Sequence, residues 1–242
     1  LLIGTTISTA AFPRLTERLA AKRTDLFRKE FLQILRVMIW VIMPVVVIAY
    51  FTRAYLARLI YTQHAPEIAL IFGFFVGAIL FRTIYAMVSR WFYAQKDTKT
   101  PLFVSLFAIA LNIFLAYILS RPTAYDVAGL AMAQSIVAAV EVVILFLIMV
   151  VRDRKLLDLE FMSGLYRILS VTGFAVIAAY IMLDVYPLTA FDRGFITLGS
   201  KLAAISGVTI GVYVLMSLIF GLEEAKTTVA KAKNIILKPV KF

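Results

Sequence analysis

Long apolar runs, separated by short polar stretches, make up most of this chain. Six of the runs reach the length of about 20 residues that a helix needs to cross the ~30 Å hydrocarbon core of a bilayer. They are Ile34–Tyr55, Ala69–Ala94, Leu102–Leu119, Val127–Val151, Leu165–Leu183 and Leu202–Gly221. The pattern therefore predicts an all-α fold, a polytopic transmembrane helix bundle.

The chain also opens inside an apolar run, Leu1–Phe12, which we interpret as the remainder of a helix whose start is missing. Gly4 and Ser8 give this run a face of small residues for close helix packing. The basic, amphipathic segment Arg14–Arg36 follows, and we expect it to lie along the membrane surface. Pro44 should kink the first complete span.

Glycines spaced four apart predict two further helix contacts. Gly73 and Gly77 form one GxxxG face, and Gly207 and Gly211 form another. Such faces let two backbones approach closely within a membrane.

Composition supports a membrane protein and removes several classes of function. Of the 242 residues, 62% are hydrophobic and 16% are charged, and the mean hydropathy is +0.94. The chain has no cysteine and one histidine, so disulfides, thiol nucleophiles and Cys/His zinc sites are excluded. The net charge of +11 lies in loops between the spans. Nucleic-acid binding needs a basic face on a soluble fold, so we expect no nucleic-acid partner.

The distribution of positive charge predicts the topology. Of the 25 Lys and Arg residues, only Arg53, Arg58, Arg121, Arg193 and Lys201 fall in one set of alternate loops. Nearly all others fall in the opposite set, which the positive-inside rule assigns to the cytoplasm. The polar turn near residue 97 and the C-terminus are therefore predicted to be cytoplasmic.

Two charged side chains lie in the middle of predicted spans. Arg82 costs at least ~2.5 kcal/mol there, so it should face a wet cavity or a carboxylate. Glu141 lies at a similar depth in a helix of the same direction, and the two could pair, although a buried Glu could instead be protonated. A structural ion pair and a role in transport both stay open. Helical spacing adds Tyr85 and Ser89 to the face of Arg82, about opposite the glycines of that span, and Gln134 to the face of Glu141.

Asn112 shares a face of its span with Ser105, Ala108 and Ala116. It either bonds across to a neighbouring helix or contributes its carbonyl oxygen to a cation site. We find no metal-ligand spacing and no catalytic set of residues, and we therefore predict no metal and no enzyme.

The turn between the second and third spans combines several signals. Aromatic residues from Trp91 to Tyr93 suit the headgroup layer. Thr100 offers a hydroxyl to cap the next helix, and Pro101 suits its first turn.

This turn also resembles a known family. The run Phe92-Tyr93-Ala94-Gln95-Lys96-Asp97-Thr98-Lys99-Thr100-Pro101 is similar to the turn of the MurJ (MviN) lipid II flippases. Gly4-Thr5-Thr6 through Phe12-Pro13-Arg14-Leu15-Thr16, Asn112, and Ala128–Ala133 match that family in order and spacing. The resemblance covers residues 1 to about 151.

The resemblance implies the C-terminal lobe of a flippase of the MOP/MATE-like exporter superfamily. On this view, residues 1–151 are lobe helices, 152–164 a cytoplasmic linker, 165–221 an extra helix pair, and 222–242 a basic cytoplasmic tail. The partners implied are membrane lipids, a lipid-linked anionic glycan precursor, and a missing N-terminal lobe.

The function implied is translocation of lipid II across the bacterial inner membrane by alternating access, without a cofactor. Coupling to Na⁺, H⁺ or the membrane potential stays open. Some relatives bind sodium near the Asn that matches Asn112, together with an acidic residue where this chain has Ala116. The alternatives are a flippase for another lipid-linked oligosaccharide, a MATE-like antiporter, and a non-transporting scaffold.

Overall fold

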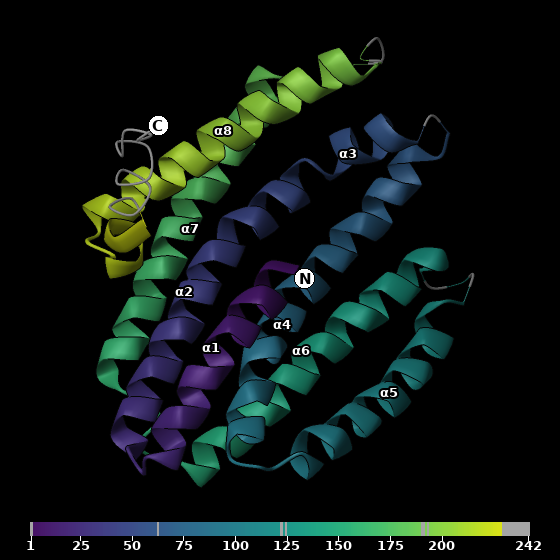
Figure 1. The fold of residues 1–242 in the computed structure, drawn as a ribbon. Coiled ribbons are helices and arrows are strands. Elements are labelled where there is room, and N and C mark those ends of the chain that lie inside the picture. Colours follow the sequence, from purple (N-terminus) through teal and green to yellow (C-terminus); the bar gives the residue numbers. More distant parts are fainter. Residues whose placement is uncertain are drawn as a thin grey trace, which may run out of the picture.

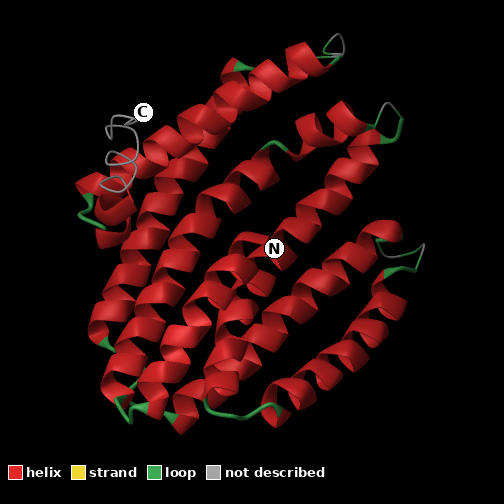
Figure 2. Ribbon diagram, viewed as in Figure 1, coloured by secondary structure: helices red, strands yellow, loops and turns green. Residues whose placement is uncertain are grey.

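The structure is a computed structural model that describes residues 2–61, 63–121, 123, 125–189, 192 and 194–228. These residues form eight helices and no strand (Figures 1 and 2). The helices are α1 Leu2–Ala20, α2 Thr24–Phe51, α3 Arg53–Ile60, α4 Ala65–Ala94, α5 Lys99–Leu119, α6 Val127–Arg152, α7 Leu159–Val185 and α8 Phe195–Ile219. Residues 223–228 are also helical.

Six of these helices, α2 and α4 to α8, are long and apolar enough to cross a membrane. The all-α, polytopic fold predicted from the apolar runs is thereby confirmed. Where the helices differ from the runs, they are mostly longer, because polar residues at the surface continue the last turn of a helix as readily as they begin a loop.

The helices form two groups joined by α2 (Figure 1). In one group α4 and α6 run side by side in the same direction, and α5 packs against the outer side of α6. In the other group α7 packs against α8. Because α2 contacts both α4 and α7, it connects the groups. The loops at residues 21–23, 95–98 and 153–158 lie together at one end of the bundle, which we call the basic end.

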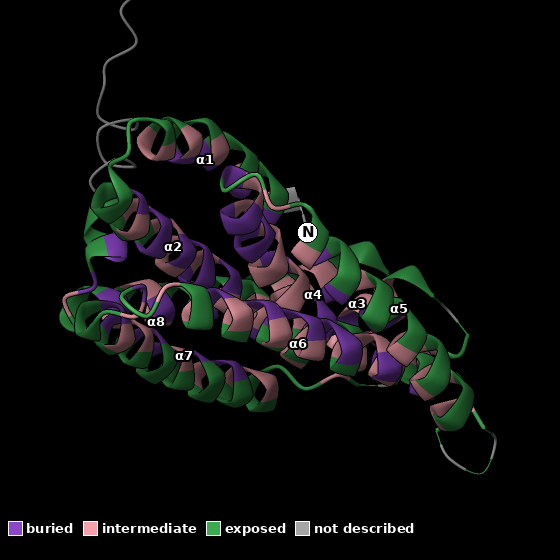
Figure 3. Cartoon of the chain, turned by 90° about the horizontal axis from the view of Figure 1, so that it is seen from below, coloured by how far each residue is buried: buried purple, intermediate pink, exposed green. Residues whose placement is uncertain are grey.

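Buried residues line the helix interfaces, and exposed residues cover the outer faces (Figure 3). The main core contains residues of α1, α2, α4, α6 and α7 and includes the fully buried Phe31, Trp91 and Leu145. The outer face of α5 exposes large apolar side chains such as Phe103 and Ile113. A helix presents such a face to lipid. Because lipid tails are as apolar as these side chains, burying the face in protein would not lower the free energy further.

The prediction that Arg14–Arg36 lies along the membrane surface is wrong. Helix α1 continues through Pro13 to Ala20, and α2 begins at Thr24 and runs on into the first span. Lys22, with φ +56°, reverses the chain between them. Leu15 and Phe27, two apolar residues of this segment, are both buried in the core. The apolar spacing of this segment is compatible with a membrane surface or with a protein core. Its location in the core follows from packing against neighbouring helices, which the spacing alone does not reveal.

Two connections also differ from the expected ones. Arg53 and Arg58, which we assigned to a loop, lie in the short helix α3. Helix α7 begins at Leu159, so the linker expected at 152–164 is shorter than predicted. Of the expected basic tail, residues 229–242 lie outside the described part of the chain.

The glycine faces had mixed outcomes. Gly4 lies against Thr83 of α4, and Ser8 is buried, so the small-residue face of α1 is confirmed. Gly77 faces Ser135 of α6. No atom lies within 4 Å of where a Cβ would stand on Gly207 or Gly211. The second GxxxG face therefore makes no helix contact in the described part of the chain.

Candidate functional site

Six polar side chains from α4, α5 and α6 meet within the membrane-spanning segments, and we call them the polar seam. They are Arg82 and Tyr85 from α4, Ser105 and Asn112 from α5, and Gln134 and Glu141 from α6. The seam forms because α6 packs against both α4 and α5, so each of these helices turns its polar face toward α6.

Arg82 and Glu141 form an ion pair in the seam. Arg82 Nη1 donates to Glu141 Oε2 over 3.2 Å. The predicted contact between these two residues is thus confirmed. The Glu141 side chain is 3% exposed, whereas that of Arg82 is 33% exposed. The carboxylate is therefore enclosed by the helices, whereas about a third of the Arg82 side chain is exposed.

A chain of hydroxyl groups holds the other side of the carboxylate. Ser105 Oγ donates to Glu141 Oε1 over 2.8 Å. Tyr85 Oη lies 3.0 Å from Ser105 Oγ. Both oxygens of Glu141 thus have donors, which lowers the free-energy cost of a buried carboxylate. Three helices are tied together at one acidic side chain.

Asn112 and Gln134 form a second pair in the seam. Asn112 Nδ2 donates to Gln134 Oε1 over 2.9 Å. This contact agrees with the interhelical alternative for Asn112. Within the described ranges, no group of three or more His, Cys, Asp or Glu residues could hold a metal ion. An ion site at Asn112 stays a prediction.

Ser89 does not join the seam, although helical spacing placed it on the face of Arg82. Its hydroxyl donates to the carbonyl of Ala86 in its own helix over 3.3 Å, and the residue is buried. A serine inside a membrane helix can make its hydrogen bond to the backbone of its own helix. Helical spacing alone therefore could not show that Ser89 stays out of the contacts that Arg82 makes.

Ser105 and Ser135 make contacts here that we did not single out from the sequence as candidates. Ser135 Oγ accepts from the backbone N–H of Ala78 over 3.1 Å and donates to the carbonyl of Phe74. The glycine face at Gly77 and the polar face at Arg82 both meet α6, so they are not on opposite sides of α4 as expected. Gly77 and Arg82 thus share one wide surface of α4, whereas Gly73 lies against Arg53 of α3.

The family-like turn is built around Arg152, the last residue of α6. The Arg152 guanidinium pairs with the Asp97 carboxylate, donates to Thr100 Oγ1 over 2.8 Å, and lies 5.5 Å from the centre of the Phe92 ring. Lys96, with φ +61°, reverses the chain at the end of α4. Hydrogen bonds from the N–H groups of Lys96 and Asp97 to carbonyls of the last helical turn close that end. The turn therefore fixes the end of α4 and the start of α5 to α6.

The capping role predicted for Thr100 belongs to Asp97. Asp97 accepts from the Thr100 hydroxyl over 2.7 Å and from the Thr100 N–H over 3.0 Å. The Thr98 side chain, at the N-cap position itself, makes no capping bond, and Pro101 is inside the first turn of α5. The bonds from Thr100, together with the charge of Arg152, hold the pKa of the Asp97 carboxyl well below its usual value.

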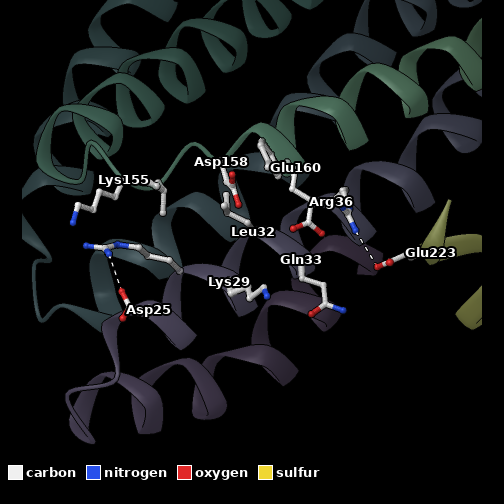
Figure 4. A pocket seen from close by; sticks show the side chains of 12 residues that line it. Asp25, Lys29, Leu32, Gln33, Arg36, Lys155, Asp158, Glu160 and Glu223 are labelled. Carbon is white, nitrogen blue, oxygen red and sulfur yellow. Dashed lines mark hydrogen bonds and ion pairs between the residues drawn. The ribbon is translucent and has the colours of Figure 1, made fainter.

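Two cavities lie away from the seam, near the first half of α2. One, of about 560 Å³, is lined by side chains that include Lys29, Lys155, Asp158 and Glu160 (Figure 4). The other, of about 590 Å³, is lined by residues of α1, α2 and the segment after α8. Acidic and basic groups face both cavities, and Arg36 borders both of them.

Comparisons with known proteins identify the chain's relatives. The family model described as Lipid II flippase MurJ matches residues 1–202. A solved structure described as Lipid II flippase MurJ, inward closed conformation, is similar with a TM-score of 0.64 and 21% sequence identity. The match covers 91% of this chain and 44% of that one, so the chain spans less than half the length of that structure. No curated protein matches the chain.

Proposed function

Because the chain belongs to the MurJ lipid II flippase family, we propose that it forms the C-terminal part of a flippase for a lipid-linked peptidoglycan precursor. The match to the family over residues 1–202 carries this proposal. The protein would be a multi-pass protein of the bacterial inner membrane, with the basic end in the cytoplasm.

The polar seam supports a role in transport. A helix bundle that only fills a membrane has no need of an ionised pair within its spans, since polar groups there raise the cost of insertion. The partly accessible guanidinium of Arg82 could offer its remaining N–H groups to an anionic headgroup. A guanidinium binds phosphate in a two-pronged geometry that an ammonium group cannot reproduce.

Pairing with Glu141 explains how Arg82 can be held in the membrane when no substrate is bound. The ion pair neutralises both charges at 3.2 Å. When a diphosphate approaches, the guanidinium can turn toward it while Ser105 continues to donate to Glu141. Alternating access of two lobes around such a site is the mechanism that we propose for the complete protein.

The proposal is tested by rescue of a bacterium depleted of its own flippase, with detection of the precursor in the outer leaflet. The full-length protein containing this chain should restore growth. Arg82→Lys should insert normally but reduce flipping, and Arg82→Ala should reduce it further. Arg121→Ala, which changes an exposed arginine outside the spans, is the matched control.

The outcomes separate the parts of the proposal. If the wild-type protein inserts correctly and fails to rescue, lipid II is the wrong substrate, and another lipid-linked oligosaccharide or a cation becomes the next candidate. If both Arg82 variants rescue as well as the wild type, Arg82 has only a structural role.

A further inference from the structure

Helix α2 contains a backbone carbonyl that cannot have its usual partner. Proline has no N–H, so Pro44 cannot donate to the carbonyl four residues earlier, and its ring also pushes that carbonyl aside. The carbonyl belongs to Trp40. Within a bilayer no water is present to replace the missing donor, so a partner must come from the protein itself.

Tyr213 of α8 supplies that donor. Its hydroxyl donates to the Trp40 carbonyl over 2.9 Å, and the bond is buried. The Tyr213 side chain is 1% exposed, so the hydroxyl has been taken out of contact with lipid and solvent. A side chain of one helix thus replaces the backbone N–H that another helix lacks.

Ser217, one turn further along α8, meets the same residue of α2. The indole Nε1 of Trp40 donates to Ser217 Oγ over 3.0 Å. The Trp40 and Tyr213 rings also lie against each other, with centroids 5.9 Å apart. Residues four apart on a helix face the same way, so α8 engages both the backbone and the side chain of Trp40.

We propose that α8 supports α2 at Pro44: the Tyr213 hydroxyl substitutes for the N–H that Pro44 lacks, so that the direction of α2 at Pro44 and the position of the α7–α8 pair change together. Helix α2 also contacts both helix groups. A change in the direction of α2 at Pro44 would therefore move the α7–α8 pair relative to α4 and α6.

The test is a double-mutant cycle on the full-length protein, read by the thermal-unfolding midpoint in detergent or nanodiscs. Tyr213→Phe leaves the Trp40 carbonyl without a donor and should lower the midpoint by about 2–6 °C. Pro44→Ala restores a backbone N–H that can reach this carbonyl. In the Pro44→Ala background, Tyr213→Phe should therefore cost much less than it does alone.

Two controls make the cycle specific. Ser217→Ala removes the bond to the indole, which does not depend on Pro44, so its cost should be the same in both backgrounds. Tyr180→Phe removes a hydroxyl from an exposed tyrosine of α7 and should leave the midpoint unchanged. Tyr50 and Leu215 are both exposed, so spin labels at these positions can report the distribution of α2–α8 distances. This distribution should be broader in Tyr213→Phe than in the wild type and narrow again in the double variant.

Each outcome decides the proposal. If Tyr213→Phe costs as much in the Pro44→Ala background as in the wild type, the Tyr213 hydroxyl does not replace the N–H that Pro44 lacks, and the proposal is overturned. If Tyr213→Phe fails to fold but the double variant folds, the proposal is supported. Failure of both variants to fold would overturn it, because Pro44→Ala should have made the hydroxyl dispensable.

Discussion

Arg82 can stay charged within the spans because Glu141 lies 3.2 Å away and is itself held by Ser105. The exposure of the two side chains is unequal, at 33% for Arg82 and 3% for Glu141. Loss of Arg82 would leave an enclosed carboxylate, whereas loss of Glu141 would leave a guanidinium that can move toward polar surroundings. The two single substitutions should therefore not be equivalent.

We predict that Glu141 and Arg82 are energetically coupled. Arg82→Ala should destabilise the protein more than Glu141→Ala, and the double variant should lose less than the sum of the two, with a coupling of about 1–3 kcal/mol. The free energy of unfolding of the two single variants and the double variant, each compared with the wild type in the same detergent, checks this prediction. Ser89→Ala combined with Glu141→Ala is the control and should be additive, since Ser89 bonds only within its own helix. Additive losses for the Arg82 and Glu141 pair would mean that they do not interact.

Asp97 gives the turn a defined dependence on pH. Its pKa in the folded protein is below the value of 3.8 that it has without these partners. A lowered pKa means that the carboxylate contributes stability above about pH 4 and loses that contribution as the pH falls below it. Asp97→Asn should thus lower the thermal midpoint at neutral pH by an amount that shrinks under acid conditions.

Midpoints of the wild type and the variant between about pH 3 and pH 7 check this expectation. Asp25→Asn, at a carboxylate whose side chain is 95% exposed, serves as the control and should differ little from the wild type. A difference between Asp97→Asn and the wild type that grew on acidification would contradict the assigned bonds to Thr100 and Arg152.

At the scale of the elements, the connection of α5 to α6 depends on close backbone contact. A Cβ built on Gly129 would stand 2.0 Å from the carbonyl oxygen of Leu119. This atom is backbone at the end of α5 and cannot move away as a flexible side chain could. Glycine is therefore required where the two helices meet after the 120–126 turn.

We predict that Gly129→Ala forces α5 away from α6 and destabilises the protein by about 1–3 kcal/mol. Gly173→Ala in α7 is the matched control, because nothing lies within 4 Å of where its Cβ would stand. That change should be neutral or slightly stabilising, since alanine favours the helix by up to about 1 kcal/mol. Equal midpoints for both variants would show that the Gly129 contact is not tight in the membrane.

At the scale of the whole molecule, the two ends of the bundle differ in charge. The basic end carries the turns near Lys22, Lys96 and Arg154, whereas the opposite end carries fewer cations. From the positive-inside rule and the attraction of anionic lipids for basic segments, we propose that this end faces the cytoplasm.

We predict that a cysteine at Gln95 reacts with an impermeant thiol reagent only after cells are opened, and that one at Gln63 reacts in intact cells. Both positions are exposed, and this chain has no cysteine of its own. Labelling can therefore be assigned to the introduced residue once any cysteine elsewhere in the full-length protein has been replaced. If intact cells show labelling of the cysteine at position 95 and protection of the one at position 63, the topology is the reverse of the one predicted.

The sequence alone was enough to predict the six spans and the all-α fold, because the bilayer requires about 20 apolar residues for each crossing and leaves no other secondary structure available. It was also enough to predict that Arg82 and Glu141 meet. A charge in hydrocarbon is so costly that a single carboxylate at matching depth was the obvious partner.

Only the tertiary structure decided which polar residues join that pair and which helix supports which. Ser89 and Ser105 look alike in the sequence, yet one bonds to its own backbone and the other to Glu141. The donor for the carbonyl freed by Pro44 comes from Tyr213, far along the chain. The helical period shows which residues share a face, but the neighbour that each face meets depends on how all the helices pack, and similar apolar surfaces allow many packings.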